Sequence, residues 1–209
     1  MKIVVFGASR GVGRNVVEQA LQAGHQVTAF VRTPSAFTLQ HPDLSVVQGD
    51  AMNAAEVERA VAGQDAVISA LGPTRPPVPG MMETSAKNIL AAMQKHGVRR
   101  LISTTGAGVR QPEDQPKVSD RFIGILLNLL AKDVVVDSAN NVKLIQNSDL
   151  DWTVVRFPRL MDGDAKGKQR FGYVSKDSST QLSRADAAEA VLKELTEKKW
   201  VKKLPLVSY

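Results

Sequence analysis

Short apolar runs and amphipathic stretches alternate along the chain from its first residues. The run Ile3–Phe6 contains no polar position and ends at a glycine, which is typical of a strand buried on both faces. The next segment repeats apolar residues at helical spacing, at Val16, Val17, Ala20 and Leu21. Gly24 follows where such a helix would stop. The pattern predicts a strand, a glycine turn and a helix.

The same alternation continues well into the second half of the chain. Further strands are predicted at Gln26–Val31, Leu44–Val47, Asp65–Ala70, Arg100–Thr104 and Trp152–Arg156. Helices are predicted at Ala54–Val61, 81–96 and Asp137–Asn147. Strands separated by helices in this way indicate βαβ units. We therefore expect an α/β fold of the Rossmann type, a doubly wound, mainly parallel sheet with helices on both faces.

The remaining segments are less regular. The strongly apolar Phe122–Leu130 predicts a helix, and Leu204–Val207 predicts a short last strand. Ser183-Arg184-Ala185-Asp186 has the character of a capping box before a helix over Ala187–Glu197. The segments 72–80, with four prolines, and 106–117 are predicted to be loops. No repeat or linker interrupts the chain, so residues 1–209 are expected to form one domain.

The segment GASRGVG lies between the first predicted strand and helix. In a dinucleotide-binding turn, one glycine permits the tight turn, one lets the backbone approach a pyrophosphate, and one lets the helix pack on the sheet. The helix N-terminus then offers free N–H groups and its positive dipole end to phosphates. Because this turn opens a series of βαβ units, it predicts a dinucleotide site rather than a plain turn, formed by Gly7, Ala8, Ser9, Arg10, Gly11, Val12 and Gly13.

The end of the second predicted strand indicates which dinucleotide is bound. Folds that bind NAD usually place an Asp or Glu there, about 20 residues past the turn, to hold the ribose 2′-hydroxyl. This chain has Arg32, followed by Thr33, and Arg10 inside the turn is a second cation. A guanidinium pairs with a 2′-phosphate that a carboxylate would repel. The alternative is two solvated surface arginines; the pattern favours NADPH over NADH.

Composition excludes several other classes of function. The net charge is +6, but aromatic residues are only 5%, and the dense basic run at Lys198-Lys199 and Lys202-Lys203 is more typical of a solvated helix end than of a nucleic-acid site. The chain has no cysteine and its three histidines are scattered, so no metal site is expected. No apolar run approaches the roughly 20 residues that span a membrane, and the N-terminus does not resemble a signal peptide. A cytoplasmic protein is expected.

Several segments together resemble a known family over nearly the whole chain: GASRGVG, VTAFVR, QGDAMNAAEVERAVAGQDAVISALG, KNILAAMQKHGVRRLISTTGAG and LDWTVVRFPRL. The sequence is similar to the atypical short-chain dehydrogenase/reductase superfamily, in the NAD(P)H-binding group that includes biliverdin reductase B (flavin reductase) and the NmrA-like proteins. The resemblance implies that one part of the cofactor site surrounds the adenine and that another part surrounds the nicotinamide and its ribose. The residues at these positions are Asp50 and Ala51 at the adenine, Ala70, Leu71 and Gly72 under the nicotinamide ribose, and Thr104, Thr105, Phe157 and Pro158 at the nicotinamide.

The chain departs from the catalytic pattern of most short-chain dehydrogenases. Those enzymes use a Tyr with a Lys four residues later, and neither Tyr173 nor Tyr209 has such a lysine. The resemblance places Ser138 where the lysine would be and Val134 where the tyrosine would be. The usual second hydroxyl corresponds to Gly106, which leaves Thr105 as the nearest candidate catalytic residue. Ordinary alcohol–ketone chemistry is therefore not expected.

Two functions remain from different classes. Biliverdin reductase B also lacks the dyad, so the resemblance favours an NADPH-dependent reductase that transfers hydride to a flavin-like or bilin-like small-molecule acceptor, with positioning supplying most of the catalysis. The alternative is a non-catalytic sensor that binds NADP(H) and acts on a partner protein, as in NmrA-like proteins. An epimerase-like enzyme is disfavoured by the missing tyrosine. The sequence does not indicate an oligomeric state.

Overall fold

The computed structural model describes residues 1–74, 76–116, 132–175 and 177–209. The predicted helix at 122–130 lies outside the described residues. In chain order the elements are β1 (Lys2–Phe6), α1 (Gly11–Gln22), β2 (Gln26–Val31), η1 (Pro34–Ala36), β3 (Leu44–Gln48), α2 (Ala54–Val61), β4 (Ala66–Ser69), α3 (Met81–His96), β5 (Arg100–Gly106), α5 (Lys132–Gln146), β6 (Asp151–Phe157), β7 (Arg159–Met161), β8 (Arg170–Gly172), β9 (Gln181–Ser183), α6 (Arg184–Glu197) and β10 (Leu206–Ser208).

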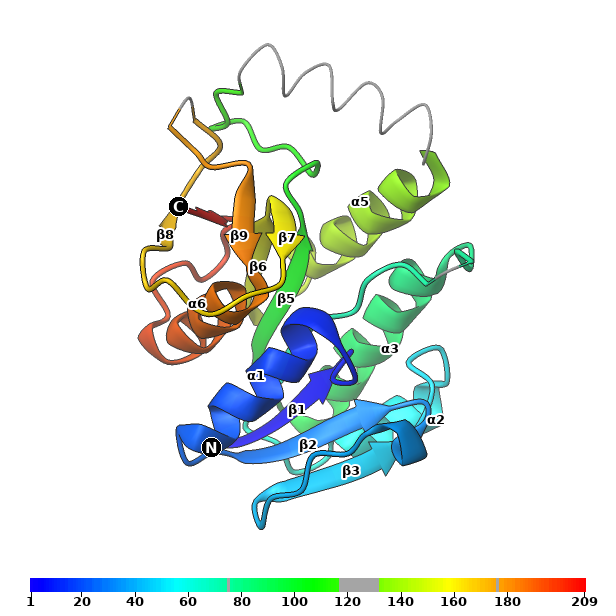
Figure 1. Cartoon of the computed structure of the whole chain (residues 1–209). Helices are drawn as coiled ribbons and strands as arrows, with labels where there is room; N and C mark the ends of the chain where they lie inside the picture. The colour runs from blue at the N-terminus through cyan, green and yellow to red at the C-terminus, as the bar shows by residue number, and fades with distance from the viewer. Residues whose placement is uncertain (75, 117–131, 176) are drawn as a thin grey trace.

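The main sheet has the strand order β3-β2-β1-β4-β5-β6-β10-β8 (Figure 1). All neighbours from β3 to β10 pair in parallel, and only β8 runs antiparallel, beside β10. The order of the first six strands is that of a doubly wound Rossmann sheet, with its switch point between β1 and β4. The predicted Rossmann-type fold is confirmed. Strands β7 and β9 form a separate two-stranded parallel sheet.

Helices cover both faces of the sheet because each central strand is apolar on both faces. Successive side chains of a strand point to opposite faces. Ile3 and Val5 accordingly pack in one core with α1 and α6, and Val4 and Phe6 pack in the other with α2, α3 and α5 (Figure 1). All four side chains are fully buried, and each contributes roughly 1.5–3 kcal/mol by leaving water.

The predicted boundaries were wrong at several places in the second half. Helix α5 begins five residues earlier than Asp137, at Lys132, and β5 continues to Gly106, where a loop was predicted to start. The strands β7, β8 and β9 were not predicted at all. Each has only three residues, which is too short for an alternating pattern to be recognised.

None of the described helices is long and apolar enough to cross a membrane.

The capping prediction at Ser183 was right in one bond and wrong in the other. Asp186 N–H donates to Ser183 Oγ at 3.0 Å, so Ser183 caps α6 and the helix begins at Arg184, not Ala187. The reciprocal bond of a capping box is not made, because Ser183 N–H donates to Tyr209 Oη at 3.1 Å. The start of α6 is therefore fixed to the C-terminal end of the described chain.

A buried ion pair holds the irregular second half together. Arg156 of β6 is fully buried and donates two hydrogen bonds to Asp114, at 2.6 and 2.9 Å. It also donates to the carbonyls of Val109 and Leu204. Asp114 accepts in addition the N–H of Val174. One side-chain pair thus joins the loop after β5, the strand β6 and the segments beside β8 and β10.

Candidate cofactor-binding site

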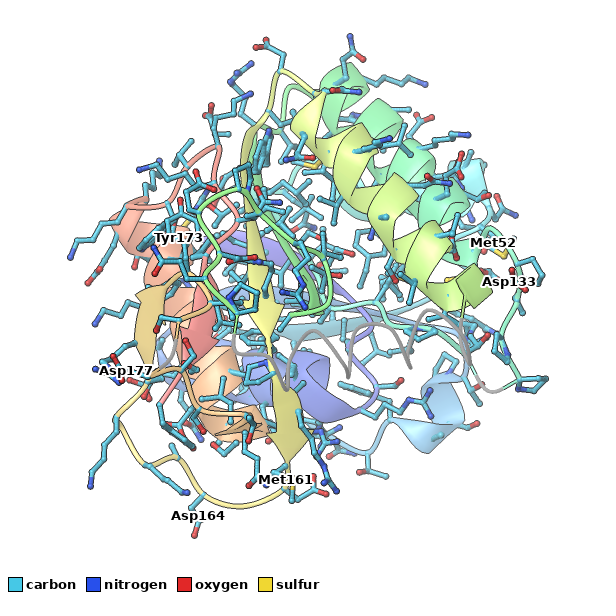
Figure 2. All side chains as sticks on the ribbon, turned by 90° about the horizontal axis from the view of Figure 1, so that it is seen from above. Met52, Asp133, Met161, Asp164, Tyr173 and Asp177 are labelled. Atoms are coloured by element: carbon cyan, nitrogen blue, oxygen red, sulfur yellow. The ribbon has the colours of Figure 1, made fainter. Side chains whose placement is uncertain are left out.

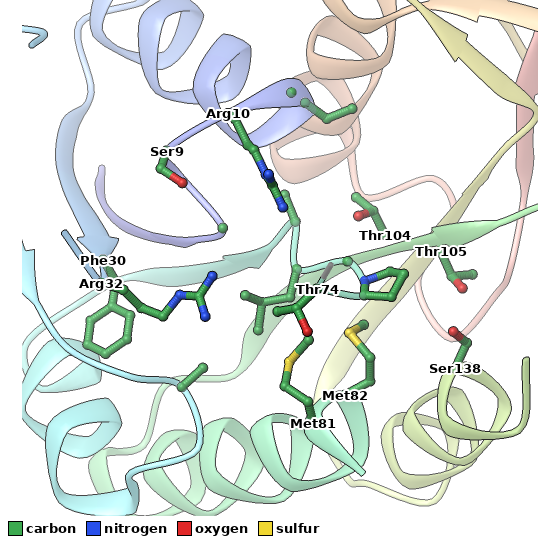
Figure 3. A pocket seen from close by; sticks show the side chains of 18 of the residues that line it. Ser9, Arg10, Phe30, Arg32, Thr74, Met81, Met82, Thr104, Thr105 and Ser138 are labelled. Atoms are coloured by element: carbon green, nitrogen blue, oxygen red, sulfur yellow. The ribbon is translucent and has the colours of Figure 1, made fainter. Parts of the chain in front are cut away.

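A cavity of about 460 Å³ opens at the carboxyl ends of β1, β2, β4, β5 and β6 (Figure 3). This is where open parallel sheets bind ligands, at the switch point between the two halves. The volume lies in the range of small-molecule and cofactor sites, roughly 300–1,000 Å³. The cavity therefore has the place and the size of a dinucleotide site.

Each glycine of the turn after β1 serves a different steric purpose. Gly7 has φ 78°, and a Cβ there would lie 2.5 Å from the carbonyl oxygen of Ala70. A Cβ on Gly13 would lie 2.2 Å from the carbonyl oxygen of Gly7. Gly11 has φ 60° and faces the cavity. Gly7 and Gly13 thus let the turn, the end of β4 and α1 pack together, while Gly11 leaves the backbone open to a ligand.

The N-terminus of α1 is open to the cavity. Its N-cap residue, Arg10, makes no side-chain hydrogen bond to the helix, and Gly11 and Val12 line the cavity wall. The first N–H groups of a helix need an acceptor, and the dipole favours an anion there. This end of the cavity can therefore accept an anionic group, such as a phosphate.

Two arginines reach the cavity from neighbouring turns. Figure 3 shows the side chains of Arg10 and Arg32 extending into the same region, one from the glycine turn and one from the end of β2. Within the described chain neither guanidinium has a hydrogen bond or ion pair with another side chain. Their positive charges are available to an anionic ligand.

The cavity wall beside Arg32 combines Phe30 and Gly49, which the sequence did not single out, with the predicted Asp50 and Ala51. Phe30 lines the cavity, and a Cβ on Gly49 would lie 2.3 Å from Phe30 Cζ, so only glycine allows that ring position. Asp50 holds the next turn: its carboxylate accepts Met52 N–H at 2.9 Å. The carbonyl oxygen of Ala51 accepts a hydrogen bond from Asn88 at 2.9 Å. These contacts form a mostly uncharged recess beside Arg32.

Hydroxyl and apolar side chains line the opposite end. Thr104 and Thr105 end β5, and Ser138 comes from α5; Figure 3 shows Thr105 and Ser138 pointing toward one another. Apolar residues complete this end: Leu71, Pro73, Val78, Met81, Met82, Phe157, Pro158 and Leu160. This part of the described lining can position a conjugated ring and exclude water from it.

Ser138 is held at the cavity by its neighbour. Asp137 accepts the N–H groups of Met82 at 3.0 Å and Glu83 at 2.9 Å, both in the first turn of α3. The N-cap residue of α3 is Gly80, which has no side chain to supply these bonds. Asp137 of α5 therefore caps α3 from outside and ties the two helices together beside the site.

Most predicted site residues meet in this one cavity. They are Gly7, Ser9, Arg10, Gly11, Val12, Arg32, Asp50, Ala51, Ala70, Leu71, Gly72, Thr104, Thr105, Phe157 and Pro158. Three others do not line it: Ala8 is buried in the core, Gly13 packs against Gly7, and Thr33 is exposed beyond the rim. The sequence did not single out the following lining residues as site residues: Phe30, Val31, Gly49, Met52, Pro73, Thr74, Val78, Met81, Met82, Leu160 and Arg184.

Neither tyrosine belongs to the cavity lining. Tyr209 donates a hydrogen bond from its hydroxyl to Asp186, and the ring of Tyr173 packs edge-on against Trp200. Figure 2 shows Tyr173 on the opposite side of the molecule from Met52, which lines the cavity. Among the described residues no group of three or more His, Asp and Glu is placed to hold a metal ion.

The sheet order, the glycine turn and the open start of α1 define a Rossmann-fold dinucleotide-binding protein. The chain belongs to the NAD(P)H-binding family, whose model matches residues 7–198. The predicted NAD(P)H-binding family is thus confirmed, and solved structures confirm the predicted fold.

The chain is also similar to part of a known dehydrogenase. The chain is 34% identical over 120 residues to a 3-beta-hydroxysteroid dehydrogenase of Mycolicibacterium neoaurum, a match covering 52% of this chain and 32% of that protein. The chain thus spans about a third of this relative's length.

Solved structures share the fold over the full chain. The anaerobilin reductase ChuY of Escherichia coli O157:H7 superposes with a TM-score of 0.82 at 22% identity, covering 100% of this chain and 97% of ChuY. A short-chain dehydrogenase/reductase of Veillonella parvula in complex with NADP has a TM-score of 0.83 at 18% identity, covering 100% and 94%.

Proposed function

We propose that this protein is an NADPH-dependent reductase that acts on a conjugated small-molecule acceptor of the flavin or bilin type. One observation carries the proposal: a single cavity joins an open helix N-terminus and two arginines, unpaired within the described chain, to a distant wall of apolar and hydroxyl side chains. The first part suits a phosphorylated dinucleotide, and the second suits an aromatic acceptor stacked on the nicotinamide. The shared fold with an anaerobilin reductase supports the bilin branch of this class.

The cofactor end is assigned from charge and shape. Arg10 and Arg32 hold the 2′-phosphate, and the N–H groups of Gly11 and Val12 at the start of α1 hold the pyrophosphate. The recess at Asp50 and Ala51 holds adenine. Ala70, Leu71 and Gly72, after β4, support the nicotinamide ribose. Neither Ala8 nor Gly13 contacts the cofactor in this proposal; they shape the turn.

The reacting end works by positioning. Bound NADPH supplies a hydride to an electron-poor ring. Phe157 and Pro158 cover that place and keep water away, while Thr105 and Ser138 offer hydroxyls to a polar group of the acceptor. Holding two reactants in a productive arrangement supplies a large share of the rate when no acid–base dyad is present. Thr105 is the proposed catalytic hydroxyl.

The proposal is tested by following NADPH oxidation at 340 nm with a panel of acceptors: riboflavin, flavin mononucleotide, quinones and linear tetrapyrroles. We expect turnover with at least one flavin or bilin, and slower turnover with NADH. Binding of NADPH without turnover across the whole panel would contradict a reductase. Failure to bind either nicotinamide cofactor would contradict the cofactor assignment itself.

One observation favours a second function, a non-catalytic NADP(H) sensor. The chain has two tyrosines, and neither lines the cavity, so the usual proton donor of short-chain dehydrogenases is missing from it. A sensor would bind NADPH, show no turnover and hold a partner protein whose affinity changes with added NADPH. Co-purification with and without the cofactor distinguishes the two functions.

A further inference from the structure

A third arginine lines the cavity at the start of α1. Arg184 is the first residue of α6, and it reaches the cavity wall beside the glycine turn. A Cβ built on Gly11 would lie 3.7 Å from Arg184 Nε and 3.9 Å from its Cδ. The guanidinium therefore lies over Gly11, a cavity-lining glycine of the turn, next to the open N–H groups of α1.

The backbone of Arg184 is fixed in this place. The preceding Ser183 caps α6, and Gln19 of α1 donates a hydrogen bond to the carbonyl oxygen of Ala185 at 3.0 Å. Asp186 is buried and accepts the N–H groups of Lys166 and Gly167. These bonds join the start of α6 to α1 on one side and to the loop before β8 on the other.

The side chain of Arg184 has a weak partner. Its Nη1 lies 2.6 Å from Asp162 Oδ1, but the carboxylate side chain of Asp162 is 96% exposed and that of Arg184 30% exposed. Exposed ion pairs contribute little to stability, because water competes for both charges. A pyrophosphate at the start of α1, partly shielded from water, is the stronger partner for a guanidinium.

We propose that Arg184 binds the pyrophosphate of the dinucleotide, exchanging its ion pair with Asp162 for the phosphate when the cofactor enters. The inference rests on the proposed function in one respect, that NAD(P)H occupies this cavity. The cations of the site then have separate roles. Arg32 and Arg10 recognise the 2′-phosphate, and Arg184 recognises the group that NADPH and NADH share.

The test compares three ligands against three variants. Dissociation constants of NADPH, NADH and 2′-AMP are measured for the unaltered protein and for three variants: Arg184→Gln, Asp162→Asn and Arg170→Gln. Arg170 is an exposed arginine of β8 outside this cavity, so its variant removes the same charge elsewhere. Since 2′-AMP carries the 2′-phosphate but no pyrophosphate, it reports on the adenine end alone.

Arg184→Gln is expected to weaken NADPH and NADH by the same factor, roughly tenfold for the loss of one charged hydrogen bond, with 2′-AMP unchanged. Asp162→Asn and Arg170→Gln are expected to keep the affinity for both dinucleotides or, for Asp162→Asn, to raise it. Thermal melting of each variant shows that it is folded.

Three results would overturn the inference while leaving the proposed function intact: unchanged dinucleotide affinity in Arg184→Gln, an equal loss in Asp162→Asn, or an equal loss of 2′-AMP. The second would show that the ion pair only holds the start of α6 in place. If the unaltered protein binds neither NADPH nor NADH, the proposed function fails, and the role of Arg184 fails with it.

Discussion

Arg32 directly follows the last residue of β2 and lines the cavity. Its guanidinium extends into the cavity and has no side-chain partner among the described residues (Figure 3). A structural arginine normally has a carboxylate or carbonyl partner, as Arg100 and Arg156 do here. An unpaired cation at this position is suited to an anionic group of a ligand, and the 2′-phosphate of NADPH is that group in our proposal.

We predict that Arg32→Asp weakens NADPH binding much more than NADH binding. The new carboxylate repels a 2′-phosphate but accepts a hydrogen bond from a ribose hydroxyl, so the preference between cofactors falls by at least about tenfold. Titration of both cofactors by fluorescence measures the ratio. Arg59→Asp, an exposed position on α2 outside the cavity, is the control. Equal losses for the two cofactors in Arg32→Asp would show that Arg32 is not the phosphate anchor.

At the scale of elements, the reacting end depends on how α5 lies against α3. The tie is the carboxylate of Asp137, which accepts two N–H groups of the first turn of α3. Asn140, one turn further along α5, donates to Glu83 of α3 at 3.0 Å. Because Ser138 lies between these two contacts, its place at the cavity is a consequence of helix capping.

Asp137→Ala is therefore expected to lower the free energy of unfolding by about 1 kcal/mol, the usual cost of losing a helix cap. Chemical denaturation measures the change. Asp133→Ala, on an exposed residue one turn earlier in α5, is the control and should change it little. If both variants are equally stable, the cap contributes nothing and Ser138 is placed by other contacts.

At the scale of the whole molecule, the buried pair Arg156–Asp114 joins segments that are far apart in sequence. Burial raises the pKa of Asp114, but the hydrogen bonds from Arg156 and from the N–H groups of Gln111 and Val174 outweigh it, so the pKa lies below its ordinary value of 3.8. A lowered pKa means that the ionised carboxylate stabilises the folded state. That contribution is complete above pH 3.8 and is lost as the pH falls through the folded-state pKa.

Asp114→Asn is expected to destabilise the protein by about 3 kcal/mol at neutral pH, because it leaves a buried guanidinium without its counter-charge. The difference in melting temperature between the parent and the variant should shrink below pH 3.8, where the parent carboxylate begins to take up a proton. Melting curves from pH 7 to pH 3 test this. Asp164→Asn, at an exposed position, is the control. A difference that stays constant with pH would contradict the assignment.

The regular part of the fold could be predicted because its signals are local. Strand β1, the glycine turn and α1 follow one another within about twenty residues, and each is marked by the period of its own apolar positions. The same holds for Arg32, whose place at the end of β2 follows from counting along the chain. The three-residue strands β7, β8 and β9 have no such period, and they form only because other segments lie beside them.

The sequence by itself determined the Rossmann class, the glycine turn after β1 and the cation after β2, since each depends on residues close together in the chain. Only the tertiary structure brought Arg184 over Gly11, the ring of Phe30 over Gly49, and Ser138 opposite Thr105. These pairs are separated by many residues, and their contacts follow from the strand order and from how α5 and α6 pack on the sheet. A local sequence pattern does not predict such contacts, because they depend on the path of the whole chain.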